Sequence, residues 1–282
     1  LSGVRPNELY ILQKLLTEQI ISADEIQKEL KLQFDYMITE QEVDESAKVL
    51  QGHFTSKDAE YQKYKEIGIL QYNESNLIKV YSSYLHCLKH AEFNAQIRDI
   101  INVGLARYRD KYASGKAEET PFVLYEKYSR RDVSLLMNCG KDMSSTMYGM
   151  SRIGDDIFVT YHKEEAEEGK NYADGKPDYA DAFEDNLIFK WDSQIGKDND
   201  SPYMKKVLSA PRKHLLVKKS DAETNFYYMG QFDVIESVNS EKEDNNGKMK
   251  PIAKVKMKMH HPVREDLLRY LQSNISKENK TA

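Results

Sequence analysis

The sequence predicts an α+β protein in which an N-terminal all-helical domain precedes a mainly antiparallel β domain. Apolar residues in the first 115 positions recur at helical spacing, and no proline occurs between positions 7 and 120. After residue 121 the apolar residues form short alternating runs that are separated by turn residues. Short strands without long helices between them indicate an antiparallel sheet, closed as a barrel or stacked as a sandwich.

The helical region contains two clear apolar stripes. The first covers residues 9–20, and the second covers residues 77–101. Between them, Ser22 is expected to cap a helix, because Glu25 stands three residues later, as in a capping box. We therefore predict a helical domain over residues 1–115.

A polar segment with Gly and Pro at 113–121 is predicted to link this domain to a β domain at 121–272. Short helices are expected at 133–137 and 262–271, and residues 273–282 are expected to be a frayed tail. The predicted strands are runs rich in β-branched and aromatic residues: 156–162, 187–191, 214–218, 226–229, 232–235 and 252–259.

The composition is that of a globular protein, with 40% hydrophobic and 31% charged residues. No apolar run is long enough to cross a bilayer, and no export signal precedes the helices, so no membrane partner is expected. Cys87 and Cys139 do not form a C-x-x-C pair, which favours a reducing cytoplasm and argues against structural zinc. Because the chain begins without methionine, it is expected to be a fragment of a longer protein.

Signatures of catalysis are missing from the sequence. It has no phosphate-binding glycine loop, no nucleophile elbow and no H-E-x-x-H motif. His86 and His90 are spaced as metal ligands on a helix can be, but no acidic partner completes such a set. We therefore expect this fragment to bind rather than catalyse, with no catalytic residue, metal or cofactor of its own.

The segment 125–133 combines two tyrosines with two adjacent arginines, which suits a polyanionic partner. Arginine binds phosphate or guanine as a planar fork, and tyrosine offers a ring for base stacking. A plainer interpretation is a helix start, with Ser129 as its cap and Asp132 three residues later. Two cations at a positive helix end oppose the helix dipole, and a bound anion would relieve that conflict. Both interpretations stay open.

Two further segments allow both a structural and a binding role. Trp191, the only tryptophan, is typical of a core residue, but it could also form a base-pocket wall beside Ser193 and Gln194. In the segment 254–259, lysines alternate with apolar residues and so share one face of a strand. Such lysines either protect an edge strand from aggregation or follow DNA phosphates.

Together with these segments, other motifs form an ordered set, which includes Tyr148-Gly149, Thr160-Tyr161-His162-Lys163, Tyr179-Ala180-Asp181 and Tyr227-Tyr228-Met229-Gly230. The set resembles the C-terminal domain of SauUSI-like type IV, modification-dependent restriction enzymes, which join a phospholipase-D-type nuclease to a superfamily-two helicase. The similarity covers about residues 121–271, and the helical half is similar to the segment that precedes this domain.

The resemblance implies recognition of 5-methylcytosine in double-stranded DNA by base flipping, with 5-hydroxymethylcytosine as a possible second target. Residues 121–272 would form a target-recognition domain with an SRA-like (SET- and RING-associated) barrel or sandwich, and residues 1–115 would couple it to the motor. The expected partners are methylated DNA and the helicase and nuclease domains of the same polypeptide. ATP and Mg²⁺ would act at those domains, in a restriction system for phage defence.

Base flipping costs a few kcal/mol, which stacking and edge hydrogen bonds offset in a closed pocket. The candidate base-pocket residues are aromatic walls and edge-reading polar groups: Tyr125, Tyr128, Tyr148, Tyr179, Asp181, Trp191, Ser193 and Gln194. The candidate DNA-backbone contacts are Arg130, Arg131, His162, Lys163, Lys218, Lys219, Lys254, Lys256 and Lys258.

Two other functions stay open. A protein-interaction module of a defence helicase, without base readout, is favoured by the acidic balance: residues 1–120 hold 15 Lys+Arg and 19 Asp+Glu. A stand-alone enzyme that acts on nucleotides would need a metal site or an acid–base pair, and the sequence indicates neither.

Overall fold

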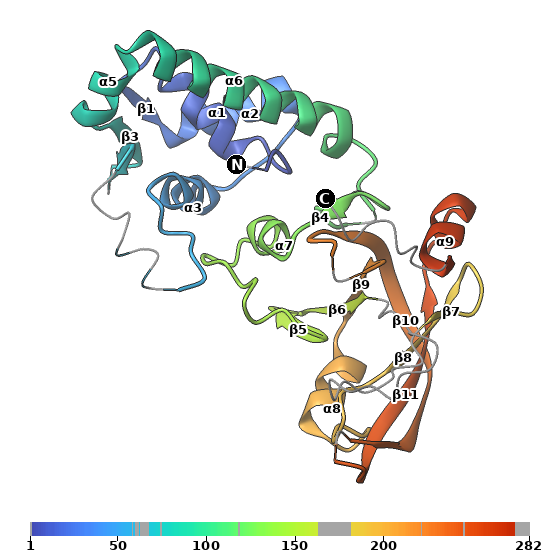
Figure 1. Cartoon of the computed structure of the whole chain (residues 1–282). Helices are drawn as coiled ribbons and strands as arrows, with labels where there is room; N and C mark the ends of the chain where they lie inside the picture. Colours follow the sequence, from blue (N-terminus) through green and yellow to red (C-terminus); the bar gives the residue numbers. More distant parts are fainter. Residues whose placement is uncertain are drawn as a thin grey trace. The chain divides into compact units, whose positions relative to one another are not determined.

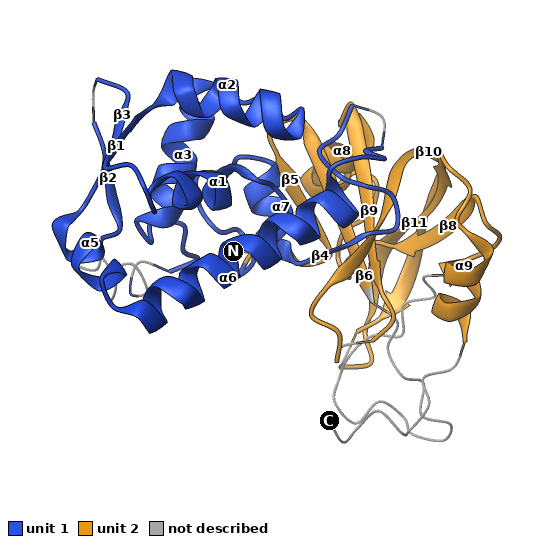
Figure 2. Cartoon of the chain, turned by 90° about the horizontal axis from the view of Figure 1, so that it is seen from above, with its two compact units in different colours: residues 1–145 blue, residues 146–282 orange. Residues whose placement is uncertain are grey.

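The chain contains two compact units, residues 1–145 and residues 146–282, which Figure 2 shows in different colours. Both contain helices and strands, which confirms the α+β class (Figure 1). The computed structural model describes residues 2–57, 59, 62, 68–73, 75–117, 119–162, 182–220, 222–244 and 246–273.

The first unit is mostly helical. Its helices are α1 (Asn7–Lys14), α2 (Ala23–Phe34), α3 (Glu40–Leu50), α5 (Ser82–Leu88), α6 (Ala91–Arg107), a π-helical turn (Tyr108–Tyr112) and α7 (Arg130–Leu136). The predicted cap of α2 is confirmed, because the Ser22 hydroxyl accepts a hydrogen bond from the Glu25 N–H at 3.2 Å. A reciprocal capping box between Thr39 and Glu42 begins α3.

The all-helical prediction for this unit is wrong. Strands β1 (Ile20–Ser22), β2 (Leu70–Tyr72) and β3 (Leu77–Val80) form an antiparallel sheet in the order β1-β3-β2, and β4 (Lys127–Tyr128) lies farther along the chain. The error arose in β3, where Leu77 and Val80 fit a helical spacing. The burial of Ile78 and Val80 on either side of exposed Lys79 is instead the alternation of a strand.

The units divide after residue 145, whereas the sequence placed a linker at 113–121. Residues beyond that predicted linker are held to the helices through buried polar groups. The buried Arg5 guanidinium donates to the Leu135 carbonyl at 2.7 Å and to the Asn138 side-chain oxygen at 2.9 Å. The Asn138 amide in turn donates to Glu42 at 2.6 Å. A buried guanidinium needs such partners, and sequence periodicity does not show where they lie.

The second unit is built on one large sheet. Its strands are β5 (Met150–Ile153), β6 (Asp156–His162), β7 (Ala182–Phe183), β8 (Ile188–Asp192), β9 (Arg212–Lys218), β10 (Phe226–Glu243) and β11 (Met249–Met259). Two short helices, α8 (Pro202–Ser209) and α9 (Glu265–Gln272), complete it. The order is β5-β6-β9-β10-β11-β8-β7, and among the strand pairs along this path that the structure describes, β6–β9 alone is parallel. Among the described strands this path does not close into a barrel.

The two strands predicted at 226–229 and 232–235 are parts of the single long strand β10, which pairs with β11 as an extended ribbon (Figure 1). The register shifts between Tyr228 and Gly230, and Gly230 has φ +97°. A glycine with positive φ is typical of a turn, and the sequence therefore predicted two strands. Here the glycine lies in a bulge, and the strand continues through it.

Candidate functional site

The segment 125–133 forms a helix start, as the plainer interpretation predicted. The Ser129 hydroxyl accepts from the Asp132 N–H at 3.1 Å, and the Asp132 carboxylate accepts from the Ser129 N–H at 2.9 Å. Tyr128 is fully buried: its hydroxyl accepts from the Val123 N–H at 2.8 Å, and its ring packs edge-on against Phe122 at 5.2 Å. Tyr128 therefore offers no open ring face, which corrects its assignment as a pocket wall.

The arginines of this segment already have partners. Arg131 pairs with Asp142 at 2.8 Å, and its guanidinium lies 4.8 Å from the centre of the Phe54 ring. Arg130 is half-buried, and so is Tyr125, which adopts φ +66°. Because Asp132 and Asp142 supply negative charge at the start of α7, a bound anion is not needed to relieve the opposition between cations and helix dipole.

The cap gives a direct test of this helix start. Replacing Ser129→Ala removes an acceptor for the Asp132 N–H, so we expect the free energy of unfolding to fall by about 1 kcal/mol. Urea denaturation of the purified chain measures this loss. Ser83→Ala is the matched control, because Ser83 is exposed in α5 and should change stability by less than about 0.5 kcal/mol. Equal losses in both variants would contradict the capping role.

The predicted pocket residues around β8 have different environments. Trp191 is 4% exposed and lies in the core, so its assignment as a pocket wall is also corrected. Ser193 is buried, and its hydroxyl accepts from the Ala253 N–H at 2.8 Å while donating to the Lys197 carbonyl, which fixes the loop after β8. Ser193 is thus a structural group rather than a base reader. Gln194, in the same loop, is exposed.

Gln194 meets another predicted residue, because its side chain lies against the Tyr148-Gly149 turn. A Cβ atom at Gly149, which has φ +66°, would lie 3.0 Å from the Gln194 amide nitrogen. Tyr148 is 58% exposed. The structure therefore places Gln194 against Gly149, the residue that follows the exposed Tyr148, at the surface of the second unit. Tyr179 and Asp181 lie outside the described residues.

The predicted cations near β9 are already engaged. Lys218 is 7% exposed, donates to the Glu223 carbonyl at 3.0 Å and lies over the Phe226 ring. Its burial corrects its assignment as a DNA-backbone contact. Lys219 is half-buried and donates to the Ser273 hydroxyl at 2.6 Å. His162 ends β6, and Lys163 lies outside the described residues.

The predicted alternation of lysines and apolar residues along β11 is confirmed. However, β11 is not an edge strand. It lies between β10 and β8, so protection of an edge does not explain its lysines. Lys254 and Lys258 are exposed, and Lys256 is half-buried. Glu184 pairs with Lys256 at 3.3 Å and with Lys190 at 3.3 Å, so this face carries mixed charge. Such a face suits a moderate, salt-sensitive contact with phosphates.

The second unit also contains a pocket of about 270 Å³ that the sequence did not predict. We call it the aromatic pocket, and its lining comprises Tyr161, Ala182, Phe183, Phe189, Val217, Lys218, Leu271 and Gln272. Three of these side chains are aromatic rings packed at angles: Tyr161 lies 5.5 Å from Phe189, and Phe183 lies 4.8 Å from Phe189, between ring centres. Tyr161 is half-buried, so part of its ring stays accessible.

Strand pairing explains how these residues meet. Tyr161 on β6 pairs with Val217 on β9, and Phe183 on β7 pairs with Phe189 on β8. The sequence did indicate that Phe189 faces the interior, because it stands two residues before Trp191 and so shares the same face of the strand. The meeting of β6 with β8 could not be inferred, because their contact depends on how the whole sheet curves.

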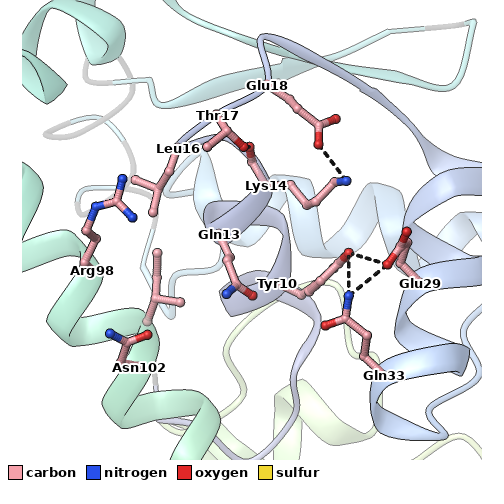
Figure 3. A pocket seen from close by; sticks show the side chains of 11 residues that line it. Tyr10, Gln13, Lys14, Leu16, Thr17, Glu18, Glu29, Gln33, Arg98 and Asn102 are labelled. Atoms are coloured by element: carbon pink, nitrogen blue, oxygen red, sulfur yellow. Dashed lines mark hydrogen bonds and ion pairs between the residues drawn. The ribbon is translucent and has the colours of Figure 1, made fainter.

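A larger cavity, of about 440 Å³, lies in the first unit between α1, α2 and α6 (Figure 3). Several of its polar groups bond one another or Glu25 nearby. Lys14 lies between Glu18 at 2.6 Å and Glu25 at 2.8 Å, while the Tyr10 hydroxyl donates to Glu29 at 3.0 Å. Burial and this hydrogen bond raise the pKa of Tyr10 to about 12, so the phenol stays protonated at neutral pH. The aromatic pocket is therefore the better candidate site for a planar ligand.

Two further searches concern metals and membranes. In the part of the chain that the structure describes, no three His, Cys, Asp or Glu side chains gather as metal ligands would. None of the helices within the described ranges is both long and apolar enough to span a membrane.

Comparison with protein families gives two matches. Residues 122–271 match the model described as Domain of unknown function (DUF3427), and residues 1–112 match Domain of unknown function (DUF8090). The two matches meet near the predicted linker, whereas the compact units meet at residues 145 and 146. Comparison with curated proteins gave no match.

Several solved structures show a limited likeness to the chain. Arabidopsis thaliana SUVH6 in complex with SAM has 11% identity and a TM-score of 0.34, over 62% of this chain and 33% of that chain. KRYPTONITE in complex with mCHG DNA and SAH has 10% identity and a TM-score of 0.32, over 64% and 41%. The sulfur binding and SRA domains of ScoMcrA complexed with phosphorothioated DNA have 9% identity and a TM-score of 0.30, over 97% and 91%. The chain thus spans about a third of the first of these structures, and TM-scores below 0.5 do not define its fold.

Proposed function

The chain belongs to the DUF3427 family, and we propose that its second unit recognises 5-methylcytosine in double-stranded DNA by taking the base into the aromatic pocket. The observation that carries this proposal is the pocket itself, with three aromatic rings around about 270 Å³. Pockets for drug-sized ligands measure about 300–1,000 Å³. The smaller volume here suits a single flat ring, such as a pyrimidine.

The energetics of the pocket fit such a base. Flipping a nucleotide out of the duplex costs a few kcal/mol, and stacking on an aromatic side chain returns about 1–3 kcal/mol per base. Tyr161 is the half-buried ring that a base would stack on, and Val217 and Leu271 give the pocket apolar surface for a methyl group. Burying one methyl group contributes about 0.8 kcal/mol, which corresponds to about a fourfold preference for the methylated base.

The surface of the same unit offers groups for the DNA backbone. Lys254, Lys256 and Lys258 share one strand face, and Lys219 directly follows the last residue of β9. Tyr148 and Gln194 are exposed on well-bonded turns and remain candidates for contact with the bases that flank the target. Because acidic side chains are interspersed among the lysines, affinity would depend on the captured base as well as on charge.

The wider setting is part of the same proposal. The parent protein would be a SauUSI-like, ATP-dependent type IV restriction enzyme in the cytoplasm, and ATP and Mg²⁺ would act at its helicase and nuclease domains. This fragment would bind without catalysing and without a cofactor. The first unit would pass the binding event to the motor.

One observation favours a protein contact for the first unit. On α6, Ile100 is 49% exposed and Val103 is 68% exposed, one helical turn apart. A coupler needs such an apolar patch for a neighbouring domain. If the whole fragment were only an interaction module, it would form a complex with the helicase domain and would not distinguish methylated from unmethylated duplexes.

Fluorescence anisotropy on duplexes of one sequence, carrying cytosine, 5-methylcytosine or 5-hydroxymethylcytosine at one position, tests the proposal. The natural chain should prefer 5-methylcytosine over cytosine about fourfold or more. Tyr161→Ala removes a stacking surface and should weaken binding of the methylated duplex about tenfold.

Tyr81→Ala is the matched control, since Tyr81 is a 40% exposed tyrosine of the first unit and does not line the pocket. It should bind as the natural chain does. A 2-aminopurine placed beside the target should brighten when the base leaves the stack. Equal affinity of the natural chain for methylated and unmethylated duplexes would overturn the proposal.

A further inference from the structure

We infer that Lys190 and Lys256 form a binding site for a DNA phosphate in the second unit, and that the Glu184 carboxylate occupies this site until DNA displaces it. The inference rests on the proposed function and deepens it, because it names a phosphate contact and a competitor built into the chain. Lys256 is one of the predicted DNA-backbone contacts, whereas Lys190 and Glu184 are not among them.

The strand register brings the two lysines together. Lys190 on β8 pairs with Lys256 on β11, and on its other side it pairs with Ala182 on β7. Residues directly opposite each other on neighbouring strands share one face of the sheet, and like charges in such a pair repel each other. Two ammonium groups in this arrangement therefore attract an anion.

The Glu184 carboxylate takes the position of that anion. Its Oε2 atom lies 3.3 Å from the Lys190 Nζ and 3.3 Å from the Lys256 Nζ. Hydrogen bonds from Lys256 and Lys190 hold the pKa of the Glu184 carboxyl below its usual value, so the group is ionised at neutral pH. A phosphodiester oxygen carries the same kind of charge and can bind the same two lysines.

The three side chains are accessible enough for this exchange. Lys190 is 52% exposed, Lys256 is 34% exposed and Glu184 is 42% exposed. Ion pairs in contact with water are weak, because water and dissolved salt screen the charges. A phosphate of approaching DNA can therefore replace the carboxylate.

The turn between β7 and β8 is held by main-chain groups rather than by the Glu184 carboxylate. The Glu184 N–H donates to the Ile188 carbonyl at 2.8 Å. The Asp185 side chain accepts from the Leu187 and Ile188 N–H groups, each at 2.7 Å. The carboxylate can therefore move away, or be removed by substitution, while the turn keeps its shape.

The phosphate site adjoins the aromatic pocket along β7. Ala182 and Phe183 line the pocket, and Glu184 follows them directly. Lys254 and Lys258 extend the row of lysines on β11. DNA whose base enters the pocket would place its phosphates near these lysines. Because every duplex must first displace Glu184, the carboxylate limits the part of the affinity that does not depend on the captured base.

The test measures the anisotropy of methylated and unmethylated duplexes of one sequence at salt concentrations from about 50 to 200 mM. Glu184→Gln keeps the size of the side chain and frees both lysines. It should bind the unmethylated duplex about fivefold more tightly than the natural chain at the lowest salt concentration. One more phosphate contact steepens the salt dependence, so this gain should shrink about three- to fourfold at the highest concentration.

Lys190→Gln gives the opposite result. It removes one phosphate contact and leaves the Glu184 carboxylate to repel the backbone, so both duplexes should bind about threefold more weakly. Unchanged binding in this variant would contradict the role of Lys190.

Glu265→Gln is the matched control for Glu184→Gln. It makes the same change of charge at an exposed residue of the same unit, and it frees Arg269, which lies 3.4 Å away. It should bind both duplexes as the natural chain does, and circular dichroism melting curves confirm that each variant is folded. A gain equal to that of Glu184→Gln would show that total charge raises the affinity, which would overturn the inference.

The outcomes separate the inference from the proposed function. If the natural chain binds methylated and unmethylated duplexes equally, the proposed function fails, and a salt-dependent gain in Glu184→Gln still supports the phosphate site. If the natural chain prefers the methylated duplex and Glu184→Gln binds both duplexes as the natural chain does, this inference alone is overturned. A gain of Glu184→Gln for poly-L-glutamate but not for DNA would assign the lysines to an acidic protein and overturn it as well.

Discussion

Replacing Asp156→Asn is expected to lower the free energy of unfolding of the second unit by about 2–3 kcal/mol, because it removes the buried carboxylate that bonds a buried imidazole and a half-exposed guanidinium. Asp156 is 4% exposed and accepts from Arg212 at 2.7 Å and 2.6 Å. It also bonds the ring of His214 at 2.7 Å, and the other ring nitrogen of His214 lies 2.9 Å from the Tyr228 hydroxyl. The neutral variant would leave a charged guanidinium and a buried imidazole without their carboxylate.

The same network predicts how stability depends on pH. Burial raises the pKa of the Asp156 carboxyl, but hydrogen bonds and charges from Arg212 and His214 outweigh burial and hold the pKa below its usual value. A carboxyl whose pKa is lowered by folding stabilises the protein above its unfolded pKa of about 3.9, and this contribution is lost as pH falls toward the folded value. The difference between the natural chain and Asp156→Asn should therefore be full at pH 7 and shrink below about pH 4.

Urea denaturation at pH 7 and at pH 3 measures both effects. Asp155→Asn is the matched control, because the neighbouring carboxylate is exposed and lies 3.9 Å from Arg152. An exposed pair of this kind contributes about 0–1 kcal/mol, so the control should stay near the natural stability. Similar losses in the two variants would show that the network does not stabilise the fold.

Trp191→Ala is expected to cost about 3–5 kcal/mol of stability, because it leaves a cavity in a well-packed core. The indole is 4% exposed, and Trp191 pairs with Val255 on β11, whose neighbour on the same face, Met257, is fully buried. If Trp191 is a core residue and not a pocket wall, another large apolar ring should replace it without loss of the preference for the methylated duplex.

Trp191→Phe therefore separates the two roles. It should be considerably more stable than Trp191→Ala and should keep the natural preference for the methylated duplex. Thermal melting and the anisotropy assay measure the two properties on the same sample. A stable Trp191→Phe variant that binds methylated and unmethylated duplexes equally would restore Trp191 to the binding site.

Most of the longer strands of the second unit could be predicted from the sequence, because each depends on local alternation, whereas β5, β7 and α8 were not predicted. The lysines and apolar residues of 254–259 alternate in burial as the pattern indicates. The first unit was harder, because residues 77–80 satisfy a helical and a strand spacing at once, and pairing with β1 and β2 decided between them. The predicted site was only partly useful: Tyr148 is exposed and Gln194 lies against the adjacent Gly149, whereas Tyr128 and Trp191 are buried.

The sequence by itself determined the α+β class, the strands with clear period-two alternation and the helix caps at Ser22 and Ser129, since these depend on neighbours along the chain. Only the tertiary structure decided which aromatic rings have an accessible face. Tyr161, Phe189 and Leu271 come from separate elements, and they line one pocket because the β sheet brings β6 toward β8 while α9 contacts β7. A pocket depends on the spacing of segments that are far apart in the sequence, and local residue patterns do not predict that spacing.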